Sequence, residues 1–175
     1  FVSGRDCFYG VDSITGKPNW RRIVGLDLPF APLQVPSAEP GLLLVDTKRH
    51  ELVLIRSKDG GLVWRLGLAA DERVTGPPLV TGGQIFLVIE TDKGHLLQIS
   101  LDTGRQAVRL TFSQPLSAPP VLLSDAAHLV IAGQQEVIYT LSLRPLACQA
   151  TSYLGHPAGS IEAPLLAMGG LVLLP

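Results

Sequence analysis

The chain has 175 residues, of which 46% are hydrophobic and 17% are charged, and its 14 Lys and Arg nearly balance its 15 Asp and Glu. This length is enough for one ordinary domain with a buried core, and the composition excludes a disordered tail. The balanced charge offers no basic surface for nucleic acid, and no apolar run approaches the ~20 residues of a membrane-spanning helix. Two cysteines are too few for a disulfide framework or a cysteine-built zinc site.

Short runs of β-forming residues, separated by turn residues, recur along the whole chain, and no segment has a sustained helical pattern. In chain order, the clearest predicted strands are 41–45, 51–55, 84–89, 95–99, 128–132 and 137–141. The turns between strands are rich in glycine, which adopts the positive φ of tight hairpins without steric cost. The sequence therefore predicts an all-β protein.

A repeat of about 44 residues organises these strands. Its markers are a turn glycine, the residue before that glycine, an aromatic or apolar residue after it, and a proline before the first strand of each repeat. The marker residues are Gly16, Gly60 and Gly104; Thr15, Asp59 and Thr103; Trp20, Trp64 and Val108; and Pro32, Pro78, Pro120 and Pro164. Four antiparallel strands in each period of this length are typical of a β-propeller blade. A β-sandwich is the alternative, but it does not explain the regular recurrence.

The turn of the first repeat resembles the tryptophan-docking motif of pyrroloquinoline-quinone-like (PQQ-like) repeats, which reads roughly Ala-x-Asp-x-x-Thr-Gly-x-x-x-Trp. The matching residues in this copy are Asp12, Thr15, Gly16 and Trp20. The second copy retains only the glycine and the tryptophan, and the third retains Thr-Gly but has a valine in place of the tryptophan. The residues retained in these two copies are Gly60, Trp64, Thr103 and Gly104. In the fourth copy, Pro-Leu replaces Thr-Gly.

The resemblance implies that the chain is a β-propeller segment of about four four-stranded blades. PQQ-like propellers usually have seven or eight blades, so we expect the chain to form part of a larger ring. We predict a single segment over 1–175, with repeat breaks near 31, 77, 119 and 163 and with both ends inside a strand. A self-closed ring of four blades is the alternative.

The resemblance also implies that each tryptophan packs against the neighbouring blade, where the turn glycine admits its ring. A large ring buries much apolar area, and its N–H needs a partner when it is buried. We therefore expect Trp20 and Trp64 to be structural anchors rather than ligand platforms. Val108, at the equivalent position of the third repeat, predicts a weaker blade junction.

We predict no catalytic, cofactor-binding or metal-binding residue in this chain. The quinoprotein dehydrogenases that share the repeat use a vicinal cysteine pair and calcium ligands, but Cys7 and Cys148 lie in different repeats. Each cysteine is interpreted as a small buried hydrophobe. His50 and His95 are interpreted as solvated loop residues.

The remaining candidate site is a polar rim formed by the hairpins between the second and third strands of each repeat. It is either a set of ordinary solvated tips or a binding surface on a rigid frame. Longer connections, such as 71–73, add further charges on the same face. The candidate rim residues are Arg5, Asp6, Lys48, Arg49, His50, Asp92, Lys93, Gln134, Gln135 and Glu136.

The resemblance favours a non-catalytic scaffold that binds proteins or ligands without a cofactor. It is closer to the scaffold type of bacterial outer-membrane assembly than to the quinoprotein dehydrogenases, and family habit implies a periplasmic or cell-envelope location. The expected partners are other proteins or the remaining blades of the same ring. Two alternatives are a fragment of a PQQ-dependent dehydrogenase whose active site lies outside this chain, and an extracytoplasmic sensor domain of a larger protein.

Overall fold

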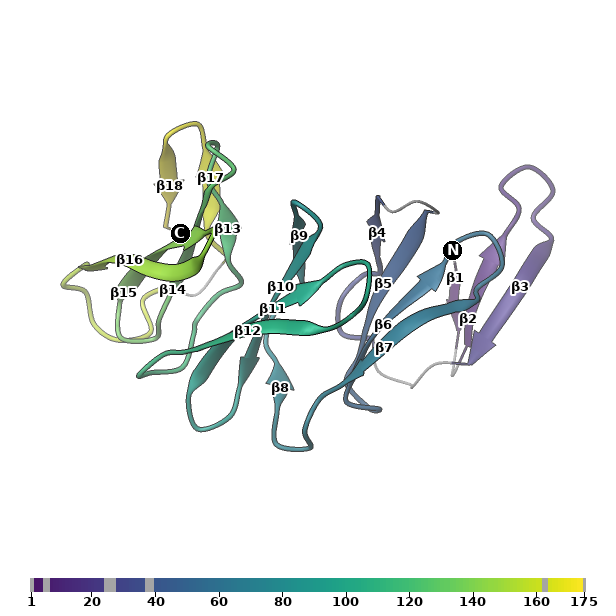
Figure 1. Ribbon diagram of the computed structural model, residues 1–175, viewed down its shortest axis with the longest axis horizontal. Coiled ribbons are helices and arrows are strands. Elements are labelled where there is room, and N and C mark those ends of the chain that lie inside the picture. Colours follow the sequence, from purple (N-terminus) through teal and green to yellow (C-terminus); the bar gives the residue numbers. More distant parts are fainter. Residues whose placement is uncertain (1, 5–6, 24–27, 37–39, 162–163, 175) are drawn as a thin grey trace. The chain divides into compact units, whose positions relative to one another are not determined.

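The computed structural model describes residues 2–4, 7–23, 28–36, 40–161 and 164–174. All regular structure in these residues is β-strand, so the prediction of an all-β protein is confirmed (Figure 1). The chain divides into two compact units. The first contains the residues up to Glu72 together with Leu101–Arg105, and the second contains Arg73–Ser100 and the residues from Gln106 onwards.

The first unit has two antiparallel sheets, ordered β1-β2-β3 and β4-β5-β6-β7. Their strands are β1 (Val2–Gly4), β2 (Cys7–Val11), β3 (Pro18–Ile23), β4 (Leu33–Val35), β5 (Gly41–Asp46), β6 (Glu51–Arg56) and β7 (Leu62–Gly67). Every residue of β5 is buried, whereas most residues of the outer strand β7 are exposed or half-buried. The continuous apolar run of β5 therefore belongs to a strand covered on both faces.

The second unit has a five-stranded, a four-stranded and a two-stranded antiparallel sheet. The first contains β8 (Arg73–Val74), β9 (Leu79–Thr81), β10 (Gln84–Glu90), β11 (Gly94–Ser100) and β12 (Gln106–Thr111). The second contains β13 (Val121–Leu122), β14 (His128–Ala132), β15 (Val137–Leu143) and β16 (Leu146–Tyr153), and the third contains β17 (Leu166–Met168) and β18 (Leu171–Leu173). The strand order of the four-stranded sheets follows the chain, as in a propeller blade.

The five-stranded sheet corrects one sequence assignment. Residue 73, which the sequence places in a connection, begins β8, and both β8 and β9 pair with β10. The first strand of this repeat is thus longer than expected and divided in two. Pro77 and Pro78 lie between the two pieces. Because proline has no backbone N–H, it interrupts the ladder of hydrogen bonds.

A shift in strand register lies between the third and fourth strands of all four repeats. The strand register shifts at residues 10/11, 54/55, 98/99 and 140/141. Such a bulge bends a strand and redirects the side chains that follow. The fourth repeat shares this shift although its turn sequence does not match the motif.

Apolar side chains of neighbouring sheets form the cores of each unit. In the first unit, Phe8 of β2 packs with residues of β5 and β6, and Trp20 lies against this cluster. In the second unit, Phe86 and Leu96 of the five-stranded sheet pack with Leu129 and Leu141 of the next sheet. Within each unit, neighbouring sheets therefore pack through apolar side chains.

Candidate functional site

The turns that carry the repeat motif place their glycine at nearly the same positive φ. We call them T1 (12–17), T2 (56–61) and T3 (101–105). Their glycines, Gly16, Gly60 and Gly104, have φ of 68°, 67° and 67°. In T1 and T2 the first residue's N–H donates to the carbonyl of the last, at 2.9 and 2.8 Å, and the glycine N–H donates to the carbonyl of the first, at 2.9 and 3.0 Å. Each of these turns thus requires a residue that tolerates positive φ.

Side chains close T1 around the Asp12 carboxylate. Its Oδ1 accepts hydrogen bonds from the Thr15 N–H at 2.7 Å, the Thr15 hydroxyl at 2.9 Å and the Ile14 N–H at 3.0 Å. These bonds favour the charged form, so the pKa of Asp12 is lowered, mainly by the backbone N–H of Thr15.

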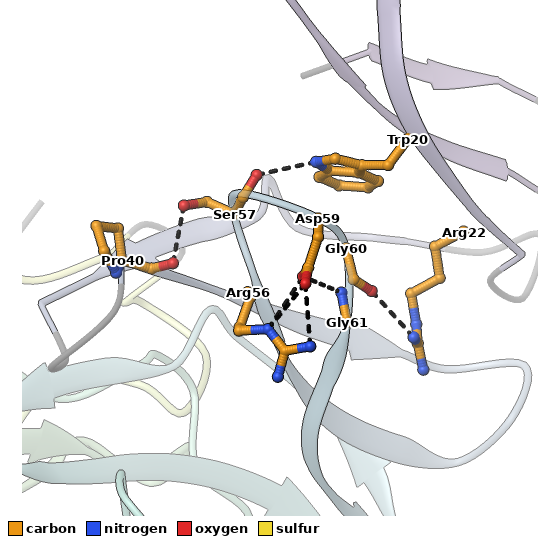
Figure 2. Close-up of polar contacts among 8 residues, drawn as sticks. All are labelled: Trp20, Arg22, Pro40, Arg56, Ser57, Asp59, Gly60 and Gly61. Carbon is orange, nitrogen blue, oxygen red and sulfur yellow. Dashed lines mark hydrogen bonds and ion pairs between the residues drawn. The ribbon is translucent and has the colours of Figure 1, made fainter.

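T2 is closed by the same two positions with their roles exchanged. Arg56 stands where T1 has Asp12, and Asp59 stands where T1 has Thr15. The Arg56 Nε donates to Asp59 Oδ1 at 3.0 Å, and the Gly61 N–H donates to the same oxygen at 2.8 Å (Figure 2). The hydrogen bond from Arg56, followed by that from Gly61, lowers the pKa of Asp59. The second copy therefore departs from the motif in sequence but retains its cross-link, and an opposite-charge pair three residues apart was the available sequence signal.

Each tryptophan donates a hydrogen bond to a backbone carbonyl 37 residues further along the chain. The Trp20 Nε1 is 2.9 Å from the Ser57 oxygen, and the Trp64 Nε1 is 2.7 Å from the Leu101 oxygen. Trp64 is 8% exposed, whereas Trp20 is half-buried. Figure 2 shows the Trp20 indole beside T2. The Arg22 guanidinium also reaches T2, where it donates to the Gly60 oxygen at 3.1 Å.

The turn glycines lie directly against these rings. A Cβ on Gly60 would lie 2.5 Å from a ring carbon of Trp20, and a Cβ on Gly104 would lie 2.5 Å from a ring carbon of Trp64. A Cβ on Gly16 would meet nothing within 4 Å. Only Gly60 and Gly104 are therefore required for close approach as well as for positive φ.

The candidate rim residues lie on three hairpin tips, which we call tip 1 (46–50), tip 2 (90–94) and tip 3 (132–137). Tip 1 belongs to the first compact unit, and tips 2 and 3 belong to the second. Arg5 and Asp6 lie outside the described residues. Lys48, Arg49, Asp92, Lys93, Gln134 and Gln135 are exposed, and His50 is half-buried.

Each tip is tied to the outer strand of its own sheet in the same way. The carbonyls of His50, Gly94 and Glu136 accept the N–H of the residue that follows the fourth strand, at 2.6, 2.9 and 3.1 Å. The donors are Leu68, Phe112 and Leu154. The exposed side chains of the tips therefore stand on a hydrogen-bonded frame.

Glu136 does not belong to an exposed rim, because its side chain is only 1% exposed. Its Oε1 accepts the N–H of Ser160 at 2.9 Å and that of Ile161 at 3.4 Å. The connection that follows β16 therefore covers this carboxylate. Glu136 organises a loop and is not available as a surface contact.

Gln114, which the sequence analysis missed, links tips 2 and 3. Its carbonyl accepts the Gly94 N–H at 3.1 Å, and its side-chain Oε1 accepts the Gln135 N–H at 2.6 Å. Its Nε2 donates to the Tyr139 hydroxyl at 2.9 Å. The side chain is buried at 6% exposure, and a Cβ on Gly133 would lie 2.7 Å from it. No repeat motif marks this position.

Two further interpretations need correction. His95 is 7% exposed rather than solvated, because it faces Thr111 across the β11–β12 ladder, where Nδ1 lies 3.0 Å from the Thr111 hydroxyl and Nε2 lies 3.0 Å from that of Thr91. Cys7 is half-buried, and Cys148 is exposed because most side chains of the outer strand β16 face solvent. Both cysteines are free.

In the part of the chain that the structure describes, no three His, Cys, Asp or Glu side chains are grouped so that they could hold a metal ion. Among the same residues, no helix has the length and apolar character needed to cross a membrane.

Consecutive four-stranded antiparallel sheets, repeated at about 44 residues, define the class of β-propellers. The family model for the outer membrane protein assembly factor BamB matches residues 4–148. The chain therefore belongs to this family of PQQ-like repeat β-propellers. No curated protein sequence matches it.

Two solved structures show the same fold. The crystal structure of BamB from Moraxella catarrhalis superposes with a TM-score of 0.64 at 15% identity, covering 87% of this chain and 45% of that one. Quinohemoprotein alcohol dehydrogenase from Comamonas testosteroni superposes with a TM-score of 0.61 at 11% identity, covering 95% and 36%. The chain thus spans less than half the length of either structure.

Proposed function

We propose that this chain is part of a non-catalytic β-propeller scaffold that binds protein partners during assembly of the bacterial cell envelope. The observation that carries the proposal is the match of residues 4–148 to a family described as an outer membrane protein assembly factor. An extracytoplasmic, periplasmic location is part of the same proposal.

The hairpin tips supply the surface for this role. Lys48 and Arg49 of tip 1, and Asp92 and Lys93 of tip 2, are exposed charged residues on tips tied to their own sheets. A fixed backbone lowers the conformational entropy that binding must remove, so these tips are better docking points than free loops. Tip 3 contributes Gln134 and Gln135, whose neutral side chains add hydrogen-bonding capacity.

Site-directed photo-crosslinking in the natural full-length protein tests the proposal. A photoreactive residue is placed at Lys48, Lys93 or Gln134 on the tips, and control residues are placed at Lys17 and Arg105, which are exposed at the motif turns. We expect adducts with components of the outer-membrane assembly machinery from the tip positions only. Equal labelling from the control positions, or no such adduct from any tip, would contradict the proposal.

A second candidate function is a segment of a PQQ-dependent dehydrogenase whose active residues lie elsewhere in a longer protein. The similarity to quinohemoprotein alcohol dehydrogenase favours it. The assay is alcohol oxidation by the full-length protein with added PQQ, calcium and an artificial electron acceptor. The scaffold proposal expects no turnover, and turnover that requires PQQ would favour the enzyme.

A further inference from the structure

The second compact unit contains an open cleft of about 600 Å³. It lies at turns between strands other than those that form tips 2 and 3. The turn between β9 and β10, the turn between β13 and β14 and the turn between β15 and β16 surround it. The lining residues that matter here are Thr81, Gly82, His128, Ser142, Leu143 and Arg144. Small-molecule sites commonly have volumes in this range.

A smaller recess of about 40 Å³ shares part of this wall. Thr81, Gly82 and Arg144 line both spaces. Gln84 and Gln98 line only the recess, as does Phe86, which is 1% exposed. The cleft therefore leads to an end where polar and apolar groups meet.

Four polar side chains of these walls have no hydrogen-bond or ion-pair partner among the described residues: Thr81, Gln84, Gln98 and Arg144. Thr81, Gln84 and Gln98 are half-buried and Arg144 is exposed, so their hydrogen-bonding groups are accessible to a ligand. A cleft of this size with a few accessible polar groups in its wall is typical of a binding site. The Arg144 guanidinium lies over the β9–β10 turn, since its Nη2 is 3.0 Å from where a Cβ on Gly82 would be.

The charge of the cleft is set by Arg144, because the other ionisable group of the wall is already paired. The His128 Nδ1 is 2.6 Å from Asp125 Oδ2, and Asp125 Oδ1 accepts the N–H groups of Ala127 and His128 at 2.8 and 3.1 Å. These bonds, with that of Ala127 the largest, lower the pKa of Asp125. The unpaired charge in the cleft is thus a single guanidinium.

We propose that this cleft binds a carboxylate carried on an apolar body. The planar guanidinium of Arg144 matches the two oxygens of a carboxylate, and one positive charge balances a monoanion but not a phosphate dianion. The amides of Gln84 and Gln98 and the Thr81 hydroxyl supply additional donors. The exposed side chains of Ala126 and Ala127, together with Leu143, form the apolar part of the cleft wall for the body of the ligand. The ligand is either a free amphiphilic acid or the C-terminal carboxylate of a peptide. The site is independent of the proposed tip surface.

Titration of the ¹⁵N-labelled full chain, followed by amide chemical shifts, tests the proposal. The probes are N-acetyl-leucine, its uncharged amide, and an N-acetylated pentapeptide that ends in leucine with a free or amidated C-terminus. We expect saturable shifts around residues 82, 126 and 144 with both carboxylates and at least about tenfold weaker binding of both amides. Tighter binding of the peptide than of N-acetyl-leucine identifies a peptide terminus as the source, and equal or weaker binding identifies a free acid.

Two variants separate a specific site from general charge attraction. Arg144→Gln should weaken carboxylate binding at least about tenfold, whereas Arg105→Gln, which removes an exposed arginine outside the cleft, should leave it unchanged. Gln98→Leu tests the contribution of the recess and should weaken carboxylate binding about threefold. Amides that bind as tightly as acids, shifts outside the cleft, or equal affinities of the Arg144→Gln and Arg105→Gln variants would overturn the proposal.

Discussion

The two compact units rely on different contacts beside their outer strands. In the first unit, Trp20 and Trp64 each donate to a backbone carbonyl of a motif turn and lie against the glycine of that turn. In the second unit, Val108 occupies the equivalent position, and the sheets meet through the edge-on pair of Phe112 and Tyr139, whose ring centroids are 4.8 Å apart, and through the buried Gln114.

This difference shows that the loss of a motif residue does not predict an empty junction. The sequence predicts a weaker junction at Val108, because valine buries less area than tryptophan and has no N–H. The structure supplies other contacts there, from a connection that carries no repeat marker. The relative strength of the two kinds of junction is open to direct measurement.

The largest effect is expected at Trp64. Replacement by alanine removes a buried ring and leaves the Leu101 carbonyl without its donor, so Trp64→Ala should lower the free energy of unfolding by about 3–5 kcal/mol. Trp20→Ala should cost less, since Trp20 is only half-buried. Urea unfolding followed by circular dichroism measures both. Equal losses would show that burial of the ring does not set the strength of these contacts.

The turn glycines allow a matched test of close approach. Gly16→Ala should cost roughly 1–2 kcal/mol, because φ is positive but no atom lies near the added Cβ. Gly104→Ala has the same φ penalty and also a clash with the Trp64 ring, so it should cost about 1–3 kcal/mol more. Urea denaturation of the two variants measures the difference. Identical losses would mean that the ring moves aside without cost.

The amide junction should be weaker than the tryptophan contact but measurable. Gln114→Leu leaves the Gln135 N–H without its partner inside the protein, and we expect a loss of about 1–3 kcal/mol. The control is Gln106→Leu on β12, where the side chain is exposed. Differential scanning calorimetry of both variants checks the prediction. If the control is destabilised as much, the amide network does not join the sheets.

The smallest effect is expected at the Arg56–Asp59 pair of T2, because both groups are largely in water. The pKa of Asp59 is lowered in the folded protein, so the pair stabilises the fold above the unfolded pKa of about 3.9. This contribution is lost as the pH falls through the lower folded pKa. Asp59→Asn should therefore lower the melting temperature slightly at pH 7 and not at pH 2. A difference that persists at pH 2 would contradict the assignment.

The sequence predicted the features that depend on local chemistry. The recurring turn glycines, the alternation of turns with β-forming runs and the tryptophan-docking motif of the first repeat were enough to indicate four-stranded units and their family. The strand ranges were close, and the prolines at 77 and 78 explain where one first strand is divided. The seven- or eight-bladed ring and the repeat breaks stay predictions.

The burial and the pairing of the candidate site residues depend on contacts between segments that no local pattern in the sequence encodes. Burial of Glu136 and His95 follows from the segments that lie over them, and the exchange of roles between Arg56 and Asp59 follows from the geometry of T2.

The sequence by itself determined the period, the strand type and the turns, because turn geometry and side-chain alternation act between neighbours along the chain. Only the tertiary structure decided which polar residues are buried, that Gln114 spans two hairpin tips, and that Arg144 lies in the wall of a cleft whose adjoining recess is lined by Gln84 and Gln98. These residues are far apart in the sequence, and packing of one sheet's turns against the next brings them together.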